Sequence, residues 1–91
     1  MPIAKSGQGI YLFDTDGKRY LDASGGAAVS CLGHGDPDII KAVKRQLEEL
    51  AFAHTSFFSS KPAEELAALL IESAPKGIDM TYFVSGGSEA I

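Results

Sequence analysis

The sequence has one cysteine, no tryptophan and no hydrophobic run long enough to cross a bilayer. A single cysteine, Cys31, cannot form an internal disulfide, which is typical of proteins from a reducing compartment. The first residues also lack the apolar core of a signal peptide. We therefore expect a cytoplasmic protein that has no membrane partner.

Positive charge is also scarce. Eight lysines and arginines stand against twelve aspartates and glutamates, and the net charge is −4. The basic residues are scattered among acidic ones, whereas a nucleic-acid surface needs a basic stripe. The sequence therefore predicts no nucleic-acid partner. The 91 residues make at most one small domain, and their apolar share of 45% is ordinary for a globular protein.

Several familiar chemical motifs are missing. His34 and His54 have no second histidine or cysteine nearby at ligand spacing, so no metal site is predicted. The sequence contains neither a P-loop nor a Gly-x-Ser-x-Gly elbow. We interpret His34, which lies between two glycines, as a loop residue hydrogen-bonded to backbone, and Cys31 as a small buried apolar residue.

Residues 10–22 have the pattern of a β-hairpin. Two runs of β-forming residues flank Asp16-Gly17, a two-residue turn in which both positions favour positive φ. Such a turn predicts three cross-strand pairs: Asp14 with Arg19, Phe13 with Tyr20, and Leu12 with Leu21. The glycine-rich residues 23–35 then predict a tightly bending loop.

Two helices are expected next. Asp36 is a good N-cap and Pro37 suits the first helical position of an amphipathic helix. Pro62 begins a second helix, whose residues 66–71 are apolar on all sides. A helix of this kind needs cover on several faces, so more chain or another subunit is implied.

The last twelve residues, 80–91, read as a strand, a glycine turn and the start of a helix. Residues 81–84 are β-formers and predict a buried strand of a parallel sheet, which makes the fold class α/β. The turn would leave the amides of Gly87, Ser88 and Glu89 free at a helix N-terminus, where phosphates bind. The alternative is that Ser85 or Ser88 only caps the helix.

Several segments jointly resemble one family, the class III aminotransferases, which are pyridoxal-phosphate enzymes that include omega-amino-acid transaminases. The matching pieces are Gly9-Ile-Tyr11, residues 14–22, Ser24-Gly25-Gly26, Leu32-Gly-His34, His54 to Phe58, and residues 83–90. Their order and spacing agree with the N-terminal part of that family across nearly the whole chain.

This resemblance implies the N-terminal fragment of a fold-type-I transferase: a β-hairpin, two helices and the start of a mainly parallel sheet. Residues 1–35 would belong to the small domain, and residues 36–91 would lead into the large domain that binds pyridoxal phosphate. The full-length protein would be a homodimer with its active site at the subunit interface.

The resemblance also assigns site residues. Gly87 and Ser88 match the residues that hold the cofactor phosphate, and Gly86 lies in the same turn. The loop from Ser24 and Gly25 to Ala28 matches a loop near the substrate pocket. Phe57 and Phe58 resemble aromatic residues at the border of that pocket, often across the subunit boundary. From the sequence alone, packing onto the core of their own domain is an equal alternative for these two rings.

In the complete enzyme, an amino group would pass from an amine or amino acid to a 2-oxo acid. The family's Schiff-base lysine matches none of the lysines present, which are Lys5, Lys18, Lys41, Lys44, Lys61 and Lys76. We therefore expect the chain alone not to transaminate. Two alternatives stay open: a non-catalytic interaction module whose helix at residues 66–71 is a partner surface, and an unrelated protein that binds a phosphorylated ligand.

Overall fold

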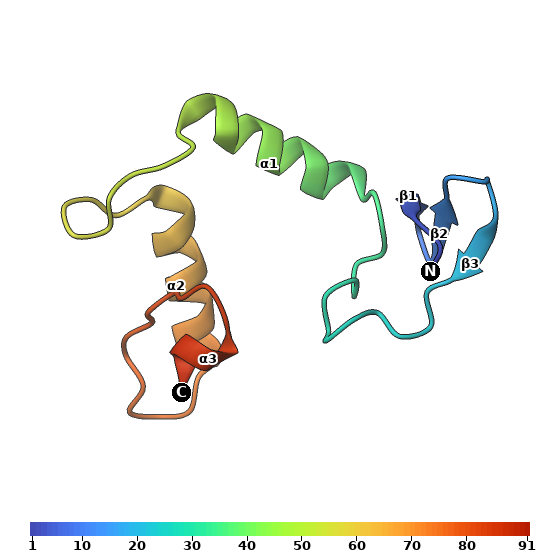
Figure 1. Cartoon of the computed structure of the whole chain (residues 1–91). Coiled ribbons are helices and arrows are strands. Elements are labelled where there is room, and N and C mark those ends of the chain that lie inside the picture. Colours follow the sequence, from blue (N-terminus) through green and yellow to red (C-terminus); the bar gives the residue numbers. More distant parts are fainter. The chain divides into compact units, whose positions relative to one another are not determined.

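A computed structural model describes all residues from Met1 to Ile91. The elements follow one another as three strands and then three helices (Figure 1). They are β1 (Ala4–Gln8), β2 (Tyr11–Asp14), β3 (Arg19–Leu21), α1 (Pro37–Glu49), α2 (Lys61–Ser73) and α3 (Gly87–Ala90). The chain divides into two compact units, Met1–Ala51 and Phe52–Ile91.

The first unit contains an antiparallel sheet with the strand order β1-β2-β3. Strand β1 is not predicted from the sequence, because its residues do not alternate between apolar and polar. It forms because Gly9, with a φ of 57°, allows a tight two-residue turn that pairs Gln8 with Tyr11. A register shift between Ala4 and Ser6 marks a bulge at the start of the strand.

The β2–β3 hairpin is present, but its register differs from the prediction by one residue. The observed partners are Tyr11 with Leu21, Leu12 with Tyr20, and Phe13 with Arg19. The predicted turn needs positive φ at both Asp16 and Gly17, and only Gly17 has it, with a φ of 81°. The loop is therefore one residue longer than predicted.

Asp14 is the reason for the longer loop. Its Oδ1 accepts hydrogen bonds from the amides of Asp16 at 3.0 Å and Lys18 at 2.8 Å. Its Oδ2 accepts the hydroxyl proton of Tyr20 at 2.8 Å, so the predicted pair with Arg19 does not form. The Tyr20 hydroxyl, with help from the Lys18 amide, lowers the pKa of Asp14 below 3.8, and the same bond raises the pKa of Tyr20 above 10.0.

Helix α1 begins as predicted. The Asp36 Oδ1 accepts hydrogen bonds from the amides of Asp38 and Ile39, both at 3.0 Å, so Asp36 is the N-cap. The apolar stripe that made this helix predictable is not covered by any part of the chain. Val43 is 53% exposed and Leu47 is 59% exposed. Helix α1 therefore gains its order from capping and backbone bonds rather than from packing.

The second unit is built around α2. As predicted, Pro62 lies in its first turn. The helix ends at Ser73, two residues before Pro75. The N-cap residue Ser60 makes no side-chain capping bond, whereas the Ser59 hydroxyl donates to the Glu64 carboxylate. The apolar face predicted to need cover stays largely open, because no hydrophobic side chain of the whole chain is buried.

Residues Thr81–Val84 form no strand here, in contrast to the sequence prediction. A β-strand gains its order from hydrogen bonds to a neighbouring strand, and the chain offers these residues no such neighbour. The only sheet is the antiparallel one of the first unit. Helix α3 nevertheless begins at Gly87, as the sequence predicts.

Candidate functional site

The turn before α3 presents backbone donors that the protein does not use. Gly86 is extended, with φ −170° and ψ 174°, and its carbonyl accepts from the Ala90 amide at 3.2 Å. The amides of Gly87, Ser88 and Glu89 donate to no acceptor within the chain. Helix α3 has no side-chain capping bond, so the alternative that a serine caps it is not observed.

The space beside Gly87 is open. A Cβ placed on Gly87 would meet no atom within 4 Å. On the Gly86 side, the Glu89 carboxylate oxygen would lie 3.1 Å from such a Cβ. The space on the side where a Gly87 Cβ would point is therefore open, whereas the Glu89 carboxylate lies close to Gly86. Unpaired backbone N–H groups at helix N-termini are, in general, suited to binding phosphate.

Phe57 and Phe58 do not pack onto a core. Both backbone amides donate to the His54 carbonyl at 3.0 Å, which bends the chain into a turn. The Phe57 ring lies against the His54 ring with a centroid distance of 5.4 Å. The two phenylalanines are 78% and 66% exposed, so both rings are available to another surface.

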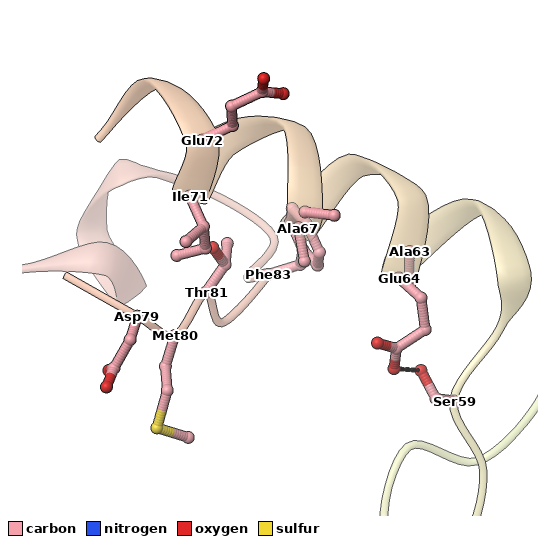
Figure 2. Close-up of a pocket in the computed structure, with 11 residues that line it drawn as sticks. Ser59, Ala63, Glu64, Ala67, Ile71, Glu72, Asp79, Met80, Thr81 and Phe83 are labelled. Carbon is pink, nitrogen blue, oxygen red and sulfur yellow. Dashed lines mark hydrogen bonds between the residues drawn. The ribbon is translucent and has the colours of Figure 1, made fainter.

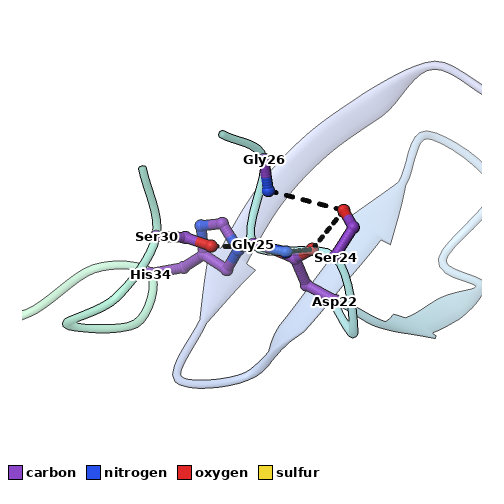
Figure 3. A network of polar contacts seen from close by, with 6 residues as sticks. All are labelled: Asp22, Ser24, Gly25, Gly26, Ser30 and His34. Atoms are coloured by element: carbon purple, nitrogen blue, oxygen red, sulfur yellow. Dashed lines mark hydrogen bonds and ion pairs between the residues drawn. The ribbon is translucent and has the colours of Figure 1, made fainter. Parts of the chain in front are cut away.

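Ser24 and Gly25 lie in a loop that is fixed by Asp22 (Figure 3). The Asp22 Oδ1 accepts the Gly25 amide at 3.0 Å and a longer bond from the Ser24 hydroxyl at 3.4 Å. The Oδ2 accepts the Ser30 hydroxyl at 3.0 Å and lies 2.7 Å from the His34 Nε2. One carboxylate therefore joins both ends of the loop.

These bonds stabilise the ionised form of Asp22. The contact with His34 is the largest cause, followed by the Gly25 amide and the Ser30 hydroxyl, and together they lower the pKa of Asp22 below 3.8. The two side chains are only 11% (Asp22) and 25% (His34) exposed. The network is thus charged and partly shielded from water at neutral pH.

Cys31 lies close to the same loop. It is exposed rather than buried, so the interpretation of Cys31 as a buried apolar residue is wrong. Its Sγ donates to the Ala28 carbonyl at 3.2 Å. In a chain with no buried hydrophobic side chain, a small apolar residue has no core to enter.

The second unit also has an open groove between α2 and residues 79–83 (Figure 2). Its lining combines apolar residues, among them Ile71 and Phe83, with three acidic residues. Its lining residues are Ser59, Ala63, Glu64, Ala67, Ala68, Ile71, Glu72, Asp79, Met80, Thr81 and Phe83. None of the site residues predicted from the sequence lines this groove.

Comparison with known proteins identifies the chain. The family model described as aminotransferase class-III matches residues 1–91. The chain belongs to the class III aminotransferases. An uncharacterised aminotransferase of Bacillus subtilis, YodT, is 44% identical over 90 residues, and a putrescine–pyruvate aminotransferase of Pseudomonas aeruginosa is 34% identical over 89 residues. These matches cover 99% and 97% of this chain.

A solved structure agrees with this identification. The omega transaminase from Pseudomonas jessenii, in complex with PMP, is 40% identical, matches 99% of this chain and has a TM-score of 0.91. This confirms that the chain has the fold of an N-terminal portion of these transaminases. The chain spans about a fifth of that structure and of the curated relatives, since each match covers 20% of the longer protein.

Membership of the class III aminotransferases implies dependence on pyridoxal phosphate. The assigned site residues fall in both units of the chain: Ser24 and Gly25 in the first, and Phe57, Phe58 and Gly86 to Ser88 in the second. No helix has both the length and the apolar character required to cross a bilayer.

Sequence reasoning found the two glycine-containing turns but missed the role of Asp22. The expected backbone bonds of His34 are present, since its amide and carbonyl pair with Gly9 at 2.8 and 2.9 Å. Its side-chain contact with Asp22 was not expected. The signal in the sequence was Asp22-Ala-Ser24-Gly25, in which an aspartate precedes serine and glycine at the spacing of a side-chain-capped turn.

Proposed function

We propose that residues 1–91 supply the cofactor-phosphate turn and part of the substrate pocket of an aminotransferase. The complete enzyme passes an amino group from an amine or amino acid to a 2-oxo acid by way of pyridoxal phosphate. The observation that carries this proposal is the set of three unused amides at Gly87, Ser88 and Glu89. Family membership supports it independently.

The phosphate would be bound mainly by backbone. The Gly87 and Ser88 amides and the Ser88 hydroxyl are its donors, and Gly86 lets the chain turn without a side chain in the way. Backbone donors suit an acidic protein, because they need no lysine. When bound, pyridoxal phosphate supplies the electron sink for amino transfer, while the protein supplies binding and orientation.

In the first unit, Ser24 and Gly25 would contribute to a substrate pocket of the complete enzyme. In the second unit, the exposed rings of Phe57 and Phe58 would border a substrate pocket. High exposure of both rings supports a role at a surface that a second subunit completes, and we propose a homodimer for the full-length enzyme. Because none of the six lysines matches the family's Schiff-base lysine, we propose that residues 1–91 alone do not transaminate.

A non-catalytic interaction module is the second candidate. It is favoured by one observation, the open apolar face of α2, where Leu66 is 46% exposed and Leu69 is 60% exposed. Catalytic and non-catalytic roles are separated by grafting. Residues 1–91 replace the matching segment of the P. jessenii omega transaminase, which has nearly the same backbone in this region. The graft should bind pyridoxal phosphate and transaminate if the first proposal holds.

The phosphate turn can be tested within this graft by a single substitution. Gly87 is the first residue of α3, where proline is tolerated, and the preceding Gly86 has an extended conformation that proline accepts. Gly87→Pro therefore removes one N–H with little change of shape. We expect the cofactor dissociation constant to rise about 10- to 100-fold, as for loss of a hydrogen bond to a charged group.

Two control variants accompany this measurement. Gly87→Ala keeps the amide and should weaken binding less than Gly87→Pro. Ser73→Ala removes a hydroxyl that binds the Leu69 carbonyl within α2, and it should leave cofactor affinity unchanged. Unchanged affinity in Gly87→Pro would show that the phosphate is held elsewhere.

A further inference from the structure

Asp22 joins three parts of the first unit that are separate in sequence. Its carboxylate accepts from the loop residue Gly25, from Ser30 at the end of the loop, and contacts His34 beyond it. Figure 3 shows the Gly25 backbone and the Ser30 and His34 side chains close to the Asp22 carboxylate. Neither Asp22 nor His34 has a part in the proposed binding of phosphate or substrate.

His34, the last of these contacts of Asp22, is held in place by its neighbours at β1. His34 pairs with Gly9 through both of its backbone groups, which forms an isolated antiparallel bridge. Its side chain lies directly over Gly7 of β1, where an added Cβ would come within 2.6 Å of the His34 Cβ. The Asp22 carboxylate is therefore bonded to a fixed partner rather than to a mobile one.

The loop between these anchors has a backbone that L-residues avoid. Gly25 and Gly26 have φ values of 63° and 64°, and Ala28 has a φ of 59° although it carries a Cβ. Left-handed conformations are unfavourable for alanine, so the loop needs bonds that hold it in place. The Gly25 carbonyl accepts from the Val29 and Ser30 amides at 3.0 Å, and Asp22 binds the Gly25 amide.

We propose that Asp22 is a positioning residue for the substrate pocket. It fixes Ser24 and Gly25 in the conformation in which they meet the substrate, and it contacts no substrate atom itself. This inference rests on the proposed function, which places that loop at the pocket. Because the phosphate turn lies in a different part of the chain, loss of Asp22 should affect substrate binding and leave cofactor binding intact.

The test uses the complete grafted enzyme with Asp22→Ala. We expect KM for the amino donor to rise about tenfold while kcat stays within about twofold, because a misplaced loop weakens substrate positioning. The cofactor dissociation constant should not change. Asp22→Asn keeps an oxygen for the Gly25 amide and should restore KM to within about threefold of the parent value.

Further variants keep the test decisive if Asp22→Ala fails to fold. Ser30→Ala removes one of the four donors and leaves the backbone bonds, so a smaller rise in KM of about threefold is expected. Asp16→Ala is the matched control, since its carboxylate lies in the exposed hairpin turn, and KM should be unchanged.

Two results separate the possible failures. If the parent graft neither binds pyridoxal phosphate nor transaminates, the proposed function is wrong. If the parent graft is active and Asp22→Ala or Ser30→Ala lowers only the melting temperature with KM unchanged, Asp22 has a purely structural role and the positioning proposal is overturned.

Discussion

The two units of the chain obtain their order in different ways. In the first unit, three aspartates each fix one turn: Asp14 in the hairpin, Asp22 in the glycine loop and Asp36 at the start of α1. In the second unit, α2 has no capping side-chain bond at its N-cap, and the β-forming residues Thr81–Val84 have no strand beside them. Short-range polar bonds thus specify the turns of the first unit, whereas α2 and residues 81–84 of the second unit lack such bonds. Both units carry apolar side chains that residues 1–91 leave uncovered.

The largest expected effect comes from the contact between β1 and His34. Gly7→Ala would place a Cβ within 2.6 Å of the His34 Cβ, which lies near the backbone and cannot swing away. We expect a loss of about 1–3 kcal/mol in unfolding free energy, as for overpacking. Denaturant unfolding of the grafted enzyme measures it. Ser6→Ala, on the same strand, should stay within about 0.5 kcal/mol, and equal effects of both variants would contradict this contact.

A smaller effect compares the two helix starts directly. Asp36→Ala removes the capping bonds to Asp38 and Ile39 and should cost about 1 kcal/mol. Ser60 at the start of α2 makes no side-chain capping bond. Because Ser60→Ala therefore removes no hydrogen bond, it should lower the unfolding free energy by only about a few tenths of a kcal/mol. Amide hydrogen exchange in the first turn of each helix is the measurement. An equal loss of hydrogen-exchange protection at both helices would contradict the claim that side-chain capping stabilises only the start of α1.

The smallest expected effect concerns the pH dependence of the unfolding free energy through Asp14 and Asp22. It is absent at neutral pH and grows as these carboxylates are protonated in acid. Their pKa values are lowered on folding, so both stabilise the folded state above the unfolded-state pKa of 3.8. This stability is lost as the pH falls below about 4 and through the lowered folded-state values. NMR titration of the carboxyl groups should show both midpoints below 3.8. Midpoints at or above that value would contradict the bonding described for the two turns.

Local sequence signals were sufficient where one residue determines the structure around it. Asp36 and Pro37 predicted the start of α1, Pro62 predicted the first turn of α2, and the two glycines before Ser88 predicted the turn into α3. Each of these depends on the chemistry of one or two side chains with the adjacent backbone. Such signals need no knowledge of the rest of the fold.

Other features could not be predicted from the sequence. They depend on competition between two turn geometries or on contacts between residues that are far apart in the sequence. The hairpin register depends on Asp14 binding two amides, which outweighs the general preference of Asp-Gly for a two-residue turn. Strand β1 has no apolar alternation, and its pairing follows from the Gly9 turn. The contact between Asp22 and His34 joins residues twelve positions apart, and a strand at Thr81–Val84 needs a neighbour.

The same distinction applies to the candidate site. The turn at Gly86 to Ser88 is a local feature, and its unused amides were expected from the sequence. The exposure of Phe57 and Phe58 was not decided by sequence, because two adjacent aromatic residues are compatible with a core, a pocket or an interface. The neighbours that a ring finds in space decide among these, and the short-range pattern does not.

The most direct test of the central claim is a crystal structure of the grafted aminotransferase with pyridoxal phosphate bound. The account predicts that phosphate oxygens accept hydrogen bonds from the Gly87 and Ser88 amides at about 2.7–3.1 Å. A structure in which the phosphate lies away from this turn, with the same amides facing solvent or protein acceptors, would contradict it.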